Sequence, residues 1–196
     1  MDELFQKGLD IISKLTNGKT HLNLDGNTNS SKVFSDAKGV ELNSFSGPHP
    51  AGNVGIQIHH LDPINKGDIV WYLEPQDIII IARLFTEGKY DVSRIISLCG
   101  SEVSKPRYYR TISGSCVANL ISDNVERENN RIICGDVLSG KKIDINGYLG
   151  FYDTQITVIK EGNDQEFLGW ALPGINKFSM SKSYFSWLFP KRKYNI

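Results

Sequence analysis

The sequence predicts an α/β domain with a parallel sheet, followed by a smaller α+β module. In the first half of the chain apolar strands alternate with helical patterns, which is typical of a parallel sheet covered on both faces. Beyond Pro106 short strands lie between Gly- and Asn-rich turns around one short helix, which indicates a mixed sheet. We therefore expect a first domain over residues 1–104, a module over 105–162 and a C-terminal segment over 163–196, with the main boundary near residues 101–106.

The first half opens with an amphipathic helix, whose apolar residues from Leu4 to Leu15 recur on one helical face. Pro75 stands where helices favour their first residue, and Gly88 ends the helix that follows. Apolar runs between such signals predict strands over 20–24, 40–45, 69–73 and 92–98, with a short helix just before Asp62-Pro63. These strands are too few for a complete doubly wound domain, so we expect the remainder of a Rossmann-like domain.

The second half is predicted to hold strands over 107–112, 131–134, 155–159 and 167–170, with a short helix over 115–122. Its end joins an aromatic cluster, Tyr184–Phe189, to a basic run, Lys191–Lys193. Such a tail could dock on an anionic membrane face or on a partner protein, or its aromatic side chains could fold back on the core.

The composition excludes several classes of protein. The chain has 196 residues, with 22 acidic and 22 basic side chains, so it lacks the basic excess typical of nucleic-acid binding. Its cysteines, Cys99, Cys116 and Cys134, are far apart and form no C-x-x-C pair, which argues against a disulfide framework or a zinc site and favours a reducing cytoplasm. No apolar run has the length of a transmembrane segment.

The loop from Gly47 to Gly55 is the main candidate for a binding site. Its two prolines and its glycines restrict the backbone and lead directly into a helix, whose N-terminus can hold an anionic or polar ligand. Gly47, His49, Gly52 and Asn53 are the candidate ligand-binding residues. The loop contains no Lys or Arg to pair with a phosphate. Alternatively, it only turns a strand tightly into a helix.

We expect Gly52 and Gly55 to hold this loop by a positive φ or by close backbone approach. The neighbouring His59 and His60 point about 100° apart on a helix, so a shared metal ion is not expected, and one of them is expected to pack with a ring nitrogen satisfied. Ser113–Cys116 is predicted to form a turn. Asp123, Glu126 and Glu128 are predicted to lie in a second turn that is exposed to solvent. No catalytic residue and no metal ligand is predicted.

The Ser-Gly-Pro-His-Pro-Ala-Gly stretch from Ser46 to Gly52 closely resembles the NqrA family, one of the component proteins of the Na⁺-translocating NADH:quinone oxidoreductases. Further landmarks of that family follow in the same order over nearly the whole chain: Asp77–Ile79, Leu84–Phe85, Lys105–Arg107, Arg110–Thr111, Val137–Gly140, Tyr148–Gly150, Val158–Gly162, Glu166–Trp170 and Lys177–Ser179. Family members are more than twice this length, so the resemblance implies a fragment: the later part of a Rossmann-like domain and a soluble-ligand-binding β-grasp (SLBB-like) module.

The resemblance implies a peripheral component on the cytoplasmic face of the bacterial inner membrane, within an enzyme complex that passes electrons from NADH to a quinone and expels Na⁺. Its partners would be the other subunits, with quinone as a candidate ligand. NAD, flavins, iron–sulfur centres and quinone would serve the whole complex, and this chain is expected to have a mainly structural and docking role without a redox centre. The alternative is a ligand-binding module in which the Gly47–Gly55 loop and the β-grasp sheet hold a quinone head group or a nucleotide.

Overall fold

The structure is a computed structural model that describes residues 2–125, 129–163 and 165–189. Contacts divide the chain into two compact units, Met1–Val92 and Ser93–Ile196. The α/β class is confirmed, because one unit holds a parallel sheet and the other a mixed sheet. Glu126, Glu128 and the basic run Lys191–Lys193 lie outside the described residues.

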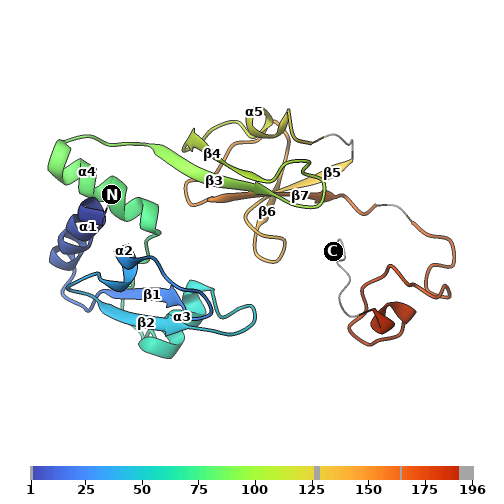
Figure 1. Cartoon of the computed structure of the whole chain (residues 1–196), viewed down its shortest axis with the longest axis horizontal. Helices are drawn as coiled ribbons and strands as arrows, with labels where there is room; N and C mark the ends of the chain where they lie inside the picture. The colour runs from blue at the N-terminus through green and yellow to red at the C-terminus, as the bar shows by residue number, and fades with distance from the viewer. Residues whose placement is uncertain (1, 126–128, 164, 190–196) are drawn as a thin grey trace. The chain divides into compact units, whose positions relative to one another are not determined.

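The first unit is an α/β unit with a two-stranded parallel sheet (Figure 1). The strands β1 (His21–Asp25) and β2 (Glu41–Phe45) pair in register from His21 opposite Glu41 to Asp25 opposite Phe45. The described helices that accompany them are, in chain order, α1 (Asp2–Leu15), α2 (Lys32–Ser35), α3 (Val54–Leu61) and α4 (Pro75–Glu87).

The core of the first unit forms where α1 packs against α4. Phe5 and Leu9 on α1 and Ile78 on α4 are buried together, and Leu22 of β1 packs against them. The helices approach closely at Gly8, where an added Cβ would lie 2.5 Å from both Cγ2 and the carbonyl oxygen of Ile78. Gly8 is therefore required by packing rather than by backbone conformation.

Helix α4 begins and ends as the sequence predicts. Glu74 and Asp77 form a capping box, in which the Glu74 backbone N–H donates to Oδ2 of Asp77 at 3.2 Å. Pro75 takes the first position, and Gly88 follows the helix with a left-handed φ of 64°.

The second unit is a five-stranded sheet with a short helix, α5 (Ala118–Ile121). The mixed sheet and the short helix are as the sequence predicts. Its strands are β3 (Ser93–Cys99), β4 (Arg107–Ile112), β5 (Asn130–Cys134), β6 (Lys141–Ile143) and β7 (Gln155–Lys160), in the spatial order β4-β3-β7-β5-β6. Strands β3 and β7 pair in parallel, and the other described pairs in this sheet are antiparallel. The core contains Ile96 and Leu98 of β3, Ile156 and Val158 of β7, and Ile121 of α5.

Strand β3 belongs to the second unit and not, as predicted, to the first. Its burial alternates along the strand, so that Arg94, Ile96 and Leu98 face inward. It lies between β4 and β7, so a boundary near residues 101–106 would cut a central strand from its sheet. The sequence prediction failed here because an apolar strand that follows a helix looks the same whichever sheet it joins.

Two predicted strands are wrong. Residues 69–73 form no strand, and the side chains of Ile69 and Trp71 are 80 % and 85 % exposed. A strand needs a neighbour for its backbone hydrogen bonds, and among the described residues β1 and β2 pair only with each other. Residues 167–170 form a turn, in which the Gly169 N–H donates to the Glu166 carbonyl oxygen at 3.2 Å. The aromatic cluster contains one turn of 3₁₀-helix, Phe185–Leu188.

Candidate functional site

The Gly47–Gly55 loop lies at the carboxyl ends of the parallel strands, where it connects β2 to α3. This edge of an open parallel sheet is where α/β folds generally bind ligands. The turn after β1 reaches the same edge, because the Gly26 N–H donates to the Phe45 carbonyl oxygen at 2.7 Å. Asp25 holds that turn by accepting from the Asn27 N–H at 2.8 Å. The structure thus brings two turns together beside the predicted loop.

The loop is held by its own backbone hydrogen bonds, and all of its residues except the partly buried Ala51 are exposed. The Ala51 N–H donates to the Pro48 carbonyl oxygen at 3.0 Å, and the Asn53 N–H to that of Pro50 at 2.8 Å. The candidate residues Gly47, His49, Gly52 and Asn53 are all exposed. Asn53 precedes α3 in an extended conformation, and its side chain makes no capping hydrogen bond. The loop can therefore present polar groups to a ligand, although it encloses none of them.

The role that we predicted for Gly52 and Gly55 is wrong. Neither residue has a positive φ, and a Cβ added to either would meet nothing within 4 Å. The conformational requirement lies instead at Gly47, whose φ is 139°. Close approach occurs at Gly26, where an added Cβ would lie 2.6 Å from the Ser44 hydroxyl oxygen.

A polar side-chain network links the loop to the sheet, and sequence reasoning missed it. Gln57 of α3 donates to the carbonyl oxygens of Ala51 and Gly52, both at 3.5 Å, and accepts from the Asn23 amide at 2.9 Å. Asn43 donates to Oδ1 of Asn23 at 3.1 Å. The two asparagines stand opposite each other in the strand register, and each follows a leucine in its strand, which was the available signal.

The network continues to a charged end. Nδ1 of His21 lies 3.2 Å from the Asn43 amide nitrogen and 3.5 Å from Oε2 of Glu41. Lys19 pairs with the other oxygen of Glu41 at 2.7 Å. This hydrogen-bonded pair lowers the pKa of Glu41 and raises the pKa of Lys19, so both groups stay charged near neutral pH.

The histidine and serine candidates show no catalytic arrangement in the described part of the chain. His59 and His60 are both exposed, contrary to the packed histidine that we expected, and their rings meet edge to face at 5.5 Å. Across the described residues, no group of three or more His, Cys, Asp or Glu side chains is placed to hold a metal ion. Ser115 closes the expected turn, since its hydroxyl donates to the Ile112 carbonyl oxygen at 2.7 Å.

Cys134 behaves as a buried apolar side chain. Burial, and second the neighbouring Asp153 carboxylate, raise the pKa of its thiol to about 12. Cys99 and Cys116 are partly buried, and all three thiols are free.

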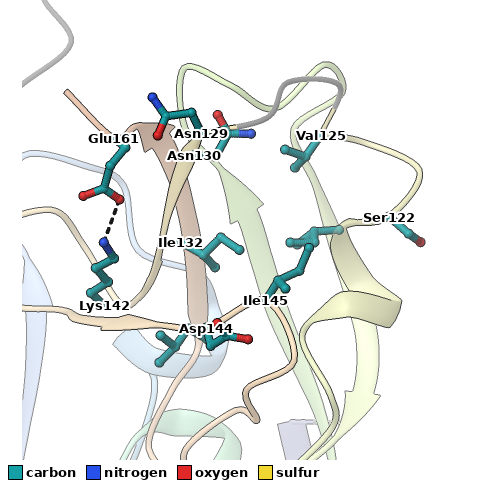
Figure 2. A pocket seen from close by; sticks show the side chains of 11 residues that line it. Ser122, Val125, Asn129, Asn130, Ile132, Lys142, Asp144, Ile145 and Glu161 are labelled. Atoms are coloured by element: carbon teal, nitrogen blue, oxygen red, sulfur yellow. Dashed lines mark hydrogen bonds and ion pairs between the residues drawn. The ribbon is translucent and has the colours of Figure 1, made fainter. Parts of the chain in front are cut away.

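A pocket of about 670 Å³ lies in the second unit, and sequence reasoning named none of its lining residues as a site (Figure 2). Apolar side chains from α5, β5, β6 and adjoining turns line it: Ile121, Val125, Ile132, Ile143 and Ile145. Polar side chains complete the lining: Ser122, Asn129, Asn130, Lys142, Asp144 and Glu161. Its volume falls within the range of small-molecule sites. Separate segments of the chain supply these residues, so no local motif could reveal it.

An ion-pair network lies at one edge of this pocket: Lys142 and Glu161 line the pocket, and Arg131 pairs with Glu161 from outside the lining. Lys142 donates to one oxygen of Glu161 at 2.8 Å, and Arg131 donates to the other at 2.9 Å. These two cations, Lys142 first, hold the pKa of Glu161 below its ordinary value. Figure 2 shows Lys142 and Glu161 joined at one edge of the pocket, with Asn129 and Asn130 at the end nearer Glu161.

Large apolar side chains are exposed in both units. In the first unit they follow one another along Ile69–Leu73, and in the second they include Phe167 and Trp170, which are 90 % and 78 % exposed. None of the helices in the described part of the chain combines the length and the apolar character that a bilayer crossing requires.

Comparison with known proteins identifies the family. Residues 1–90 match the family described as "NqrA second alpha/beta domain", and residues 95–144 match "NQRA C-terminal domain". The NqrA proteins of the Na⁺-translocating NADH-quinone reductases from Pasteurella multocida and Rhodopirellula baltica are 40 % and 42 % identical over 99 % and 98 % of this chain. That of Histophilus somni is 43 % identical over 91 % of it.

The chain spans about two fifths of the length of these relatives, 43 %, 42 % and 40 % respectively. The two matched regions fall on either side of the division between the two units. Both matches name the same protein, and the identity extends over nearly the whole chain. The chain therefore belongs to the NqrA family of Na⁺-translocating NADH-quinone reductase subunits.

Proposed function

We propose that this chain is a structural and docking part of a Na⁺-translocating NADH:quinone reductase, peripheral to the cytoplasmic face of the bacterial inner membrane. In this proposal the other subunits are its partners, and NAD, flavins, iron–sulfur centres and quinone act elsewhere in the enzyme complex. The first unit is the remainder of a Rossmann-like domain, and the second is a β-grasp module. The family of the chain and the names of its relatives support this assignment.

The exposed run Ile69–Leu73 is the observation that carries the docking role. Five consecutive apolar residues lie on the surface of the first unit, with Trp71 85 % exposed. Burial of apolar area is worth about 25 cal/mol per Å², so such a run gains free energy when another protein surface covers it. Contiguous exposed apolar surface generally marks an interaction site.

The test places a charge within this run in the full-length NqrA protein. Trp71→Glu should reduce co-purification with the other subunits of the complex at least tenfold, because the new carboxylate would have to be buried without a partner. Leu15→Glu is the matched control: Leu15 is 69 % exposed in the same unit but lies outside the run, at the end of α1. Both variants should keep the melting temperature of the unmodified chain. Complexes that assemble fully with Trp71→Glu would contradict the docking role.

Ligand binding at the Gly47–Gly55 loop is the second candidate function, for a quinone head group or a nucleotide. Its support is the position of the loop at the carboxyl ends of the parallel strands. A ligand of this loop should raise the melting temperature of the chain, and His49→Ala should abolish that rise. His60→Ala, an exposed histidine on α3 beyond the loop, should leave it unchanged. If neither quinone analogues nor nucleotides change the melting temperature, this function is ruled out.

A further inference from the structure

The aromatic segment, residues 165–189, exposes its large apolar side chains instead of burying them. Trp170 and Met180 are 78 % and 88 % exposed, and Trp187 is more than half exposed. Of the described residues in this segment only Gly169 and Ser186 are buried, and none of the segment belongs to the core cluster of the five-stranded sheet. The aromatic side chains therefore do not fold back on that core, which was one of the two outcomes left open by the sequence.

Polar contacts tie the two halves of the aromatic segment to each other. The Lys177 ammonium donates to the Gly169 carbonyl oxygen at 2.7 Å and pairs with the Glu166 carboxylate. The Phe185 N–H donates to the Pro173 carbonyl oxygen at 2.8 Å. The exposed aromatic side chains are thus carried on turns that these contacts join into one unit of structure.

The charge of this region is positive, although the whole chain has no net charge. From residue 165 onward the sequence contains five basic residues and a single acidic one, Glu166, whose carboxylate pairs with Lys177. Lys182 is exposed, and the other three basic residues stand at positions 191–193, outside the described residues. Positive charge beside exposed aromatic side chains complements an anionic surface.

The surface of a bilayer with anionic lipids fits these features better than a groove on a protein. Protein grooves usually bind apolar side chains that recur along one face of a helix or a strand. The described residues of this segment form turns and one short 3₁₀-helix, with no α-helix and no strand (Figure 1). Backbone groups in turns need water, which the headgroup layer supplies and the hydrocarbon core does not. Trp and Tyr side chains favour that same layer.

We propose that residues 165–189 bind the headgroup layer of a bilayer that contains anionic lipids, with Trp170 and Trp187 among the headgroups. Lys182 lies beside the lipid phosphates and supplies electrostatic attraction. This contact goes beyond the docking proposed above, because its partner is lipid rather than protein. It is also independent of the exposed run in the first unit and of the candidate ligand loop.

The experiment measures binding of the full chain to two kinds of vesicle, one of phosphatidylglycerol and phosphatidylcholine and one of phosphatidylcholine alone. Trp71→Phe removes the tryptophan outside the segment, so that Trp170 and Trp187 alone report. Their emission should shift to the blue on the anionic vesicles and be quenched by brominated acyl chains. Binding should be at least tenfold tighter than to the neutral vesicles. Salt at about 1 M, where the screening length is about 3 Å, should reverse it.

Two matched pairs of variants separate the site from general effects. Trp170→Ala should weaken binding to the anionic vesicles at least fivefold, whereas Tyr108→Ala, a similarly exposed aromatic residue on β4, should leave it unchanged. Lys182→Glu should weaken binding to the same degree, whereas Lys141→Glu, an exposed lysine on β6, should not. Cosedimentation with the vesicles measures all four.

Absence of binding to both kinds of vesicle, equal binding to both, or equal losses in a variant and its control would overturn the proposal. Loss of co-purification with the other subunits in Trp170→Ala, without any vesicle binding, would assign the segment to a protein partner and would also overturn it. The co-purification of Trp71→Glu is a separate measurement, so the lipid contact and the docking role can fail independently.

Discussion

At the scale of single residues, close contacts decide which glycines are essential. Gly8 lies in the middle of α1, where a glycine ordinarily weakens a helix by about 1 kcal/mol relative to alanine. It is tolerated because any side chain there would overlap both the side chain and the backbone of Ile78. Gly52, which the sequence singles out more strongly, has no neighbour within 4 Å of an added Cβ.

Gly8→Val should therefore destabilise the first unit by about 1–3 kcal/mol, the usual cost of overpacking a well-packed core. Gly52→Val is the control and should change stability by less than about 0.5 kcal/mol, as exposed positions usually do. Urea unfolding of both variants measures the difference. An unchanged midpoint for Gly8→Val would show that α1 and α4 separate without cost.

The three thiols should differ in reactivity, because the thiolate is the form that reacts. Burial raises the pKa of Cys134 to about 12, so its thiol stays protonated in mildly alkaline buffer. Iodoacetamide should leave Cys134 unmodified in the folded chain and modify it in denaturant, as mass spectrometry of the peptides would show. Rapid modification of Cys134 under native conditions would contradict its burial.

At the scale of elements, the ion pairs of Glu161 tie β5, β6 and the end of β7 together. Because the folded-state pKa of Glu161 is lowered, its stabilising effect is complete above the unfolded value of about 4.5 and is lost as the pH falls through the folded pKa. The melting temperature of the second unit should therefore fall with acidification in that range. Glu161→Gln should flatten this dependence, whereas Glu102→Gln, on the turn that follows β3, should not. If the melting temperatures of the unmodified chain and of both variants depend on pH in the same way, the ion pairs of Glu161 do not cause the loss of stability in acid.

Elements with strong periodicity could be predicted from the sequence, and short polar ones could not. The helices beginning near Leu4 and at Pro75 and the strands over 107–112, 131–134 and 155–159 are present within a few residues of their predicted bounds. Strand β6 contains only Lys141, Lys142 and Ile143, so it has too few residues to show a period of two. It forms because β5 provides a partner, which is a tertiary effect.

The candidate sites follow the same distinction. The residues of the Gly47–Gly55 loop are contiguous in the sequence, so their composition alone indicates a loop. The structure places this loop between a strand and a helix, as expected. Neither the Asn23–Asn43–Gln57 network nor the pocket around Ile132 could be predicted, because each depends on which strands pair. The error over Ile69–Leu73 has the opposite cause: its apolar composition indicates a buried strand, but no strand within the described residues pairs with it.

At the scale of the whole molecule, the division at residues 92 and 93 defines what can fold alone. A chain of residues 93–196 retains the central strand β3 and should give a dispersed amide spectrum. A chain of residues 105–196 lacks β3, so β4 and β7 lose their shared neighbour, and it should remain unfolded. Circular dichroism and amide dispersion distinguish the two outcomes. Cooperative folding of residues 105–196 would show that the sheet can close without β3.

Gly100, directly after β3, has a φ of 123°, and any Cβ there would collide with the carbonyl oxygen of Val158. The positive φ and the contact with backbone both disfavour a side chain at this position. Neither a change of rotamer nor a small shift of a flexible neighbour would relieve the strain of a substitution. Over evolutionary time this codon should accept only synonymous changes, while Gly52 drifts freely. Deep mutational scanning of this chain should find position 100 among its least tolerant sites.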